Sequence, residues 1–167
     1  MANIIQISDF DGGRFSIAVN SFQENELQAY IDQYQKEALI DLLGLELYEL
    51  LILDLDANGV PQSQIYLDIF NDFYKEIYGE YERSQGIKFY LKGIIYFHYV
   101  RDLYNRQTTV GVKKVKGENS DSVNVFDIYT RYNNSIETGK VIQAYIYNND
   151  TDYPTFKGQE LDFVINI

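Results

Sequence analysis

The chain of 167 residues contains no cysteine, no tryptophan, one histidine and two prolines. Without cysteine it cannot form a disulfide, a thiolate zinc site or a cysteine nucleophile. Its single histidine, His98, excludes histidine-rich metal sites and lowers the expectation of histidine-based catalysis. The apolar run Ile94–Phe97 is far shorter than the ~20 residues that a membrane-spanning helix requires. We therefore expect no membrane partner, and the polar start Met1–Asp9 predicts no signal peptide.

Positive charge is also scarce, because 14 Lys and Arg stand against 25 Asp and Glu and the net charge is -11. This balance predicts a soluble protein that repels duplex DNA and anionic membranes unless a local basic patch opposes the net field. Aromatic residues are abundant, with 16 Tyr and 10 Phe. Tyrosine has an apolar body and a polar tip, so these residues suit either the rim of a core or an extensive protein interface.

Helical periodicity predicts a mainly α protein, a bundle of about four to six helices with a protruding loop or hairpin and extended N- and C-terminal arms. Ser21 with Glu24 forms a capping box that predicts the first helix start. Predicted helices extend from Ser21 to just before Gly44 and over residues 45–53, 63–78, 87–105, 123–134 and 136–147. The fourth is apolar over more than half its circumference, so it is the predicted central helix.

The predicted organisation is an N-terminal arm of residues 1–20, a bundle of residues 21–150 with a protruding loop at 107–122, and a C-terminal tail of residues 151–167. Alternating apolar residues in the first arm and in Leu161–Ile167 indicate strand character. These arms have no predicted sheet to join, so we expect them to pair with each other or to add to a neighbouring subunit.

Most candidate chemistry in the sequence is weak, and we expect no enzymatic activity, no cofactor and no metal. Asp54–Gly59 matches the first half of a calcium loop, but its twelfth position is Ile65 instead of a glutamate, so a polar inter-helix turn is the favoured interpretation. His98 lies within an aromatic helix and is expected to be a core or interface residue. The spacing of the many carboxylates singles out no catalytic pair, and Gly111–Gly117 lacks the lysine and hydroxyl ending of a phosphate-binding loop.

The most distinctive stretch is Gly86–Asp121, where an aromatic helix gives way to a polar loop. Four cations gather there in an otherwise acidic chain: Arg106, Lys113, Lys114 and Lys116. The nearby valines suggest a hairpin-like excursion, and Gly111 and Gly117 supply backbone freedom where it bends. Either this is a solvated surface loop, or it is an arm that contacts an acidic partner surface or DNA phosphates.

Three motifs of this stretch resemble the head–tail connector proteins of tailed bacteriophages, most closely those of phages of Bacteroidetes hosts, including crAss-like phages. The motifs are Tyr96-Phe97-His98-Tyr99-Val100-Arg101-Asp102, Thr108-Thr109-Val110-Gly111-Val112-Lys113 and Glu118-Asn119-Ser120. The resemblance covers about residues 22–147. It implies a small helical protein without catalytic residues, which forms a ring, usually twelvefold, beneath the portal at the capsid vertex.

Such a ring extends the DNA channel toward the tail. Its implied partners are the portal protein, neighbouring copies, downstream tail or neck proteins, and DNA that passes without specific binding. The implied location is the virion, after assembly in the host cytoplasm. The residues predicted to contact partners or subunits are Arg101, Thr108, Thr109, Gly111, Lys113, Lys114, Lys116, Glu118, Asn119, Phe163 and Ile165.

Two alternatives remain open at this point. The first is another phage neck or tail-completion adaptor module, which the sequence barely separates from a connector. The second is a carboxylate-based hydrolase acting on nucleic acid or glycans, which would require a cluster of carboxylates in a cleft.

Overall fold

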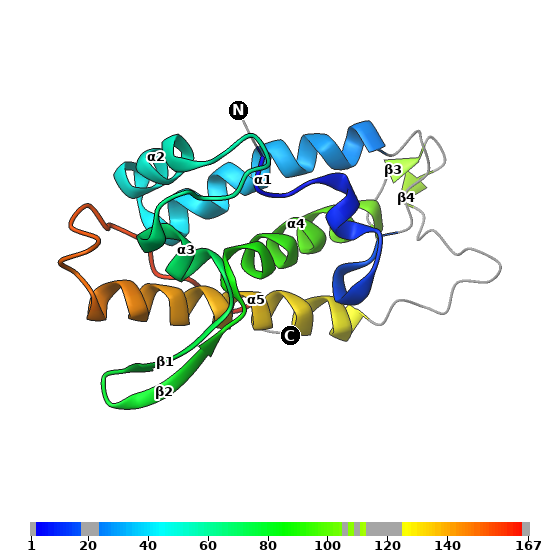
Figure 1. Cartoon of the computed structure of the whole chain (residues 1–167). Coiled ribbons are helices and arrows are strands. Elements are labelled where there is room, and N and C mark those ends of the chain that lie inside the picture. Colours follow the sequence, from blue (N-terminus) through cyan, green and yellow to red (C-terminus); the bar gives the residue numbers. More distant parts are fainter. Residues whose placement is uncertain (1–2, 18–23, 105–106, 109–110, 113–124, 165–167) are drawn as a thin grey trace.

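The computed structural model describes residues 3–17, 24–104, 107–108, 111–112 and 125–164, and this part of the chain is mainly helical (Figure 1). Its α-helices are α1 (Glu24–Leu43), α2 (Leu45–Asp54), α3 (Gln64–Phe70), α4 (Gly86–Tyr104) and α5 (Val125–Asn148). The short 3-10 helices are η1 (Ile7–Phe10) and η2 (Gly13–Phe15), and the strands are β1 (Phe73–Ile77), β2 (Glu80–Ser84), β3 (Gln107–Thr108) and β4 (Gly111–Val112). The predicted mainly α bundle is confirmed.

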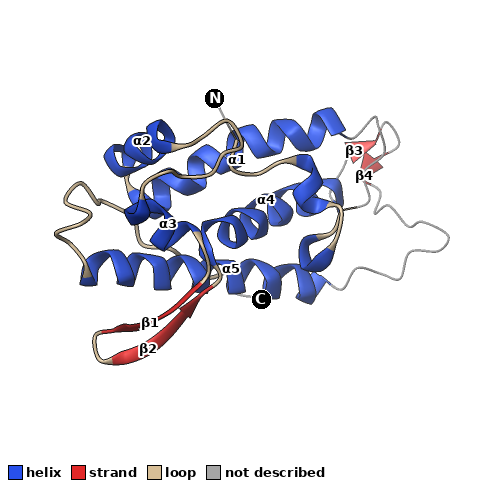
Figure 2. Cartoon of the chain, in the orientation of Figure 1, coloured by secondary structure: helices blue, strands red, loops and turns tan. Residues whose placement is uncertain are grey.

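Helix α4 is the centre of the bundle, as its sequence predicts. It lies between α1 and α5, while α2 covers the outer side of α1 and the β1–β2 hairpin lies on α5 (Figures 1 and 2). Ile87, Leu91 and Ile95 recur at every fourth position of α4 and are completely buried. Each such side chain contributes about 1.5–3 kcal/mol by leaving water. The described chain therefore has one contiguous core, with α4 in its middle.

The corner between α1 and α2 is closed by the C-terminal tail. Gly44 adopts a φ of +80°, and a Cβ there would lie 2.7 Å from the backbone of Lys157. The backbone N–H of Lys157 donates to the carbonyl of Leu43 at 3.2 Å, and the side-chain amide of Gln143 donates to that of Leu42 at 3.0 Å. Carbonyls at the end of a helix lack partners within it, and here the tail and α5 supply them.

The helix predicted over residues 63–78 is wrong in its second half. Helix α3 ends at Phe70, and Phe73–Ile77 pairs in antiparallel fashion with Glu80–Ser84. Tyr78 and Gly79 form the two-residue loop with φ values of 53° and 86°. Two consecutive positive φ values define the turn that matches the twist of a β-hairpin. Alternating burial, with Phe73 and Ile77 inward, then favours strand over helix.

The two helices predicted over residues 123–134 and 136–147 form a single helix, α5. The predicted gap between them falls at Ser135. In the structure the Asn133 side chain instead donates to the carbonyl of Val164 and accepts from its N–H, at 3.1 and 3.0 Å. The Ser135 hydroxyl donates to the carbonyl of Arg131 at 3.1 Å. These side chains have partners that leave the helix backbone uninterrupted.

The strand character predicted for the N-terminal arm is wrong for the residues that the structure describes. The first segment forms the turns η1 and η2, and it buries Ile4, Ile5, Phe10 and Phe15 in the core. The N–H of Ile5 donates to the buried amide oxygen of Gln35 at 2.9 Å, which fixes this segment on α1. Residues 161–164 follow α5 without forming a strand. The predicted cap Ser21 lies outside the described residues.

Candidate functional site

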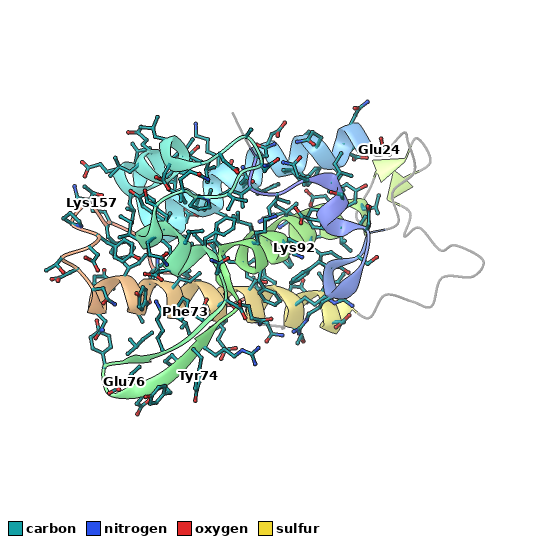
Figure 3. All side chains as sticks on the ribbon, in the orientation of Figure 1. Glu24, Phe73, Tyr74, Glu76, Lys92 and Lys157 are labelled. Carbon is teal, nitrogen blue, oxygen red and sulfur yellow. The ribbon has the colours of Figure 1, made fainter. Side chains whose placement is uncertain are left out.

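The β1–β2 hairpin projects from the bundle and carries a cluster of exposed tyrosines. Tyr74, Tyr78 and Tyr81 are 68%, 69% and 64% exposed. The rings of Tyr74 and Tyr81 stack on each other with centroids 5.4 Å apart. In Figure 3, Tyr74 and Glu76 lie along the free part of the hairpin, below α5. We call these three residues the tyrosine face. Exposed aromatic residues that are already ordered are typical of protein interfaces.

The base of the hairpin is fixed rigidly on α5. The ring of Phe73 packs on that of Tyr145 with centroids 5.1 Å apart. The ammonium of Lys75 donates to the hydroxyl of Tyr145 at 2.9 Å, lies 4.3 Å from its ring centroid, and pairs with Asp68 at 3.4 Å. A cation over an aromatic ring contributes about 0.5–2 kcal/mol. The tyrosine face is therefore presented on an ordered support.

A second exposed apolar surface lies on α2. We call Leu45, Leu50 and Leu53 the leucine face; Leu53 is 84% exposed. Helix α2 packs on α1, whereas the hairpin packs on α5, so α1, α4 and α5 separate the two faces (Figure 1). Leu53 at this exposure gains little from packing in the isolated chain, and grouped exposed apolar residues mark interaction sites.

Arg101, a predicted contact residue, lies in the last turn of α4 in a polar cluster. Its guanidinium donates to the carboxylate of Asp102 at 2.9 Å, and that carboxylate also accepts from the hydroxyl of Tyr30 at 2.9 Å. Burial alone would raise the pKa of Asp102, but the hydrogen bonds from Arg101 and Tyr30 outweigh it and lower the pKa below its usual value. Burial, followed by the bond to Asp102, raises the pKa of Tyr30 to about 12.

His98 packs among aromatic rings beside this cluster. Its ring stacks on that of Tyr34, with centroids 3.9 Å apart and planes 7° from parallel, and it meets the ring of Phe97 edge-on. Burial, and then the charge of Arg101, lower the pKa of His98, so the imidazole is neutral at pH 7. Part-buried stacking of a neutral ring is the packing role that the sequence predicts for this residue.

A pocket of about 230 Å³ lies between α1, α4, α5 and the tail. Four carboxylates line it: Glu37, Asp41, Glu160 and Asp162. Burial, and then the proximity of Glu37, raise the pKa of Asp41. This arrangement is the carboxylate cluster in a cleft that a hydrolase would require, and it arises because the tail folds back over α1.

Asp41→Asn is expected to stabilise the protein at pH 7. A carboxyl whose pKa is higher in the folded state than in the unfolded state stabilises the fold while it is protonated. This contribution is complete below the unfolded pKa, near 3.9, and is lost as the pH rises through the folded pKa. The ionised Asp41 at neutral pH is thus unfavourable, and asparagine removes its charge. Thermal unfolding followed by circular dichroism should give a higher Tm for the variant at pH 7 and a smaller difference at pH 3. Glu49→Gln, at an exposed position of α2, is the matched control, and an equal gain there would contradict the explanation.

The Asp54–Gly59 segment forms the predicted polar turn between helices. The Asp54 carboxylate accepts from the N–H groups of Gln62 and Ser63 at 2.8 and 2.7 Å, and also from the Ser63 hydroxyl. Asp56 accepts from the N–H of Val60 at 2.9 Å. The carboxylates thus satisfy backbone donors that precede α3. Across the described ranges, no group of three or more His, Asp or Glu could hold a metal ion.

Of the other predicted contact residues, the structure describes Thr108, Gly111 and Phe163. Thr108 and Gly111 lie opposite each other in the β3–β4 pair, which confirms the predicted hairpin for these strand residues. Phe163 is 47% exposed, and the ammonium of Lys140 lies 4.2 Å from its ring centroid on α5. The residues outside the described part are Thr109, Lys113, Lys114, Lys116, Glu118, Asn119 and Ile165. The structure therefore places Phe163 in the tail, beside Lys140 of the second half of α5.

Sequence reasoning missed the tyrosine face, although its signal was present. Tyr78-Gly79 lies between two short segments whose successive residues belong alternately to the two faces of a strand. A two-residue turn between such segments indicates a β-hairpin. The leucine face had no comparable signal, because α2 is rich in leucine on every side.

Comparison with known proteins gives no match to any protein family, to any curated protein or to any solved structure. Among the helices that the structure describes, none is long and apolar enough to cross a membrane.

Proposed function

We propose that this protein is a structural subunit of a phage neck, a head–tail connector that forms a ring with its own copies beneath the portal and extends the DNA channel. The proposal has two supports: the resemblance of residues 22–147 to connector proteins, and the positions of the two exposed faces. The second carries the most weight. The tyrosine face and the leucine face differ in composition and lie on opposite sides of the helical layers.

Two unlike surfaces on opposite sides of a subunit favour head-to-tail assembly. A contact between identical surfaces closes as a dimer, whereas a contact between different surfaces continues until it closes as a ring or extends as a filament. A ring with a net charge of -11 per subunit would also repel DNA from the channel wall and leave it mobile during packaging and ejection. We therefore infer a role in assembly, without catalysis.

The proposal is tested by the mass of the purified protein alone and with the portal protein, measured by light scattering during size exclusion. We expect a ring of defined stoichiometry, or a complex with portal, and we expect the protein at the capsid vertex of virions in cryo-electron microscopy maps. A protein that stays monomeric and never binds portal is not a connector.

Replacing Tyr74, Tyr78 and Tyr81 with serine is expected to weaken assembly at least tenfold, because truncating a single well-placed interface tyrosine commonly costs about 2 kcal/mol. The exposed side chains contribute little to the isolated fold, so the melting temperature should change by only a few degrees. The dissociation constant of the assembled species, from mass measurements over a dilution series, is the readout. Tyr147→Ser changes an exposed tyrosine of α5 and is the control. Unchanged assembly of the triple variant would remove the tyrosine face from the interface.

The pocket around Asp41 supports a second candidate, a carboxylate-based hydrolase of glycans or nucleic acid. A raised pKa beside a second carboxylate is the arrangement that lets one group act as an acid and the other as a base. Turnover of a polysaccharide or oligonucleotide substrate by the purified protein, lost in both Asp41→Asn and Glu37→Gln, would favour this function over the connector. We expect no turnover.

A further inference from the structure

The hairpin and α5 line an open groove of about 530 Å³, and Tyr78 of the tyrosine face is part of its lining. Its lining combines apolar side chains from both elements with carboxylates. The apolar residues are Ile77, Val141 and Ala144, and the carboxylates are Glu80, Glu82 and Glu137.

The negative charge of this groove has no partner within the described residues. Glu80, Glu82 and Glu137 take part in none of the ion pairs or side-chain hydrogen bonds found there. The groove also contains Lys140, but its ammonium lies over the ring of Phe163, 4.2 Å from the centroid. Three like charges at the edge of an apolar floor repel one another, and they would be stabilised by a cationic segment with an apolar residue at its centre.

The chain contains such a segment, Lys113-Lys114-Val115-Lys116, in which three lysines flank one valine. We propose that the groove binds the Lys113–Lys116 segment of a neighbouring copy. The valine covers the floor at Val141 and Ala144, and the lysines pair with the three glutamates. This inference rests on the proposed ring and names a further contact between its subunits, in addition to the tyrosine and leucine faces.

The segment of the same chain is too far away to fill the groove. Strand β4 ends at Val112, at the end of the bundle where α5 begins (Figure 1). Four extended residues reach about 14 Å beyond Val112. The groove residues Glu137–Ala144 lie about 18–28 Å along α5 from Val125, at 1.5 Å per residue. Pairing between different copies is therefore favoured, and because groove and segment are different surfaces, the contact continues around a ring.

Charge reversal tests this contact with two triple variants, K113E/K114E/K116E and E80K/E82K/E137K. Each alone should lose assembly at least tenfold in the mass measurement with portal present, because like charges then face each other. An equimolar mixture should assemble again, since each variant offers the charge that the other lacks, and the chain with all six changes should assemble by itself. D11K/E24K/E49K changes the net charge as much as the groove variant, at exposed positions away from it, and should assemble like the wild type.

Assembly of either triple variant at the wild-type level would overturn the groove contact and leave the connector function standing. Failure of both the mixture and the sixfold variant would overturn it too. A wild-type chain that never associates, with or without portal, would overturn both proposals.

Disulfide trapping gives an independent readout because the chain has no cysteine of its own. Under mild oxidation, a mixture of Ala144→Cys and Val115→Cys chains should form a covalent heterodimer at least tenfold faster than a mixture of Gln33→Cys and Val115→Cys chains. Gln33 is exposed on α1, outside the groove. Equal rates in the two mixtures would contradict the contact.

Discussion

Gly86→Ala is expected to lower the free energy of unfolding by about 3 kcal/mol or more. Gly86 joins β2 to α4 with a φ of +79°, a backbone conformation that costs an L-residue about 1–2 kcal/mol. An added Cβ would also lie 2.8 Å from the backbone of Asn71 and closer still to the carbonyl oxygen of Phe70. Backbone atoms cannot rotate away as a side chain can, so relief of the clash requires the β2–α4 junction to move.

Gly79→Ala is the matched control for that prediction. Gly79 has a φ of +86°, yet a Cβ there would meet nothing within 4 Å. Its cost should therefore be the conformational part alone, about 1–2 kcal/mol. Urea unfolding at equilibrium measures both variants. Equal losses would show that the close approach to Phe70 and Asn71 contributes nothing.

Gly93→Ala is expected to destabilise the protein by about 3 kcal/mol through the packing of α4 on α5. Gly93 lies inside α4, and a Cβ there would overlap both Oγ and Cβ of the buried Ser135 on α5. The new methyl group must push the two central helices apart. Overpacking of a dense core costs about 1–3 kcal/mol and occasionally more.

Ser135→Gly should rescue part of that loss, because it removes the atoms that the methyl group would overlap. Alone, it should cost about 1 kcal/mol, since it places glycine inside α5 and loses the bond to the carbonyl of Arg131. In a double-mutant cycle from urea unfolding, we expect a coupling energy of about 2 kcal/mol in favour of the double variant. Additive losses would mean that the two helices do not meet at these positions.

The sequence predicted the helices whose ends and buried faces are local features, and it failed where distant residues decide. The break at Gly44 and the helical periodicity of apolar residues in α1 and α4 were sufficient to predict those helices. Residues 73–84 were ambiguous, because Ile69, Phe73 and Ile77 also follow a helical spacing of four. The turn at Tyr78-Gly79 and burial against Tyr145 on α5, 70 residues from Lys75, favour the strands.

The candidate surfaces were less predictable than the fold. Composition showed many tyrosines but not which of them lie at the surface, because exposure depends on the hairpin that was missed. The pocket around Asp41 depends on the tail lying across α1, which brings Asp162 beside a residue early in the chain. The cationic segment is evident from charge alone, whereas the acidic groove that would complement it exists only when β2 and α5 are packed together.

The tail that closes the α1–α2 corner has a consequence for synthesis on the ribosome. Leu42 and Leu43 leave the exit tunnel early, whereas Gln143 and Lys157, which bond to their carbonyls, are made more than a hundred peptide bonds later. Until then these carbonyls have only water as a partner, and Gly44 faces an empty corner. A nascent chain can therefore form its first helices but cannot complete this corner until Lys157 has left the exit tunnel, so native packing there is a late event in folding.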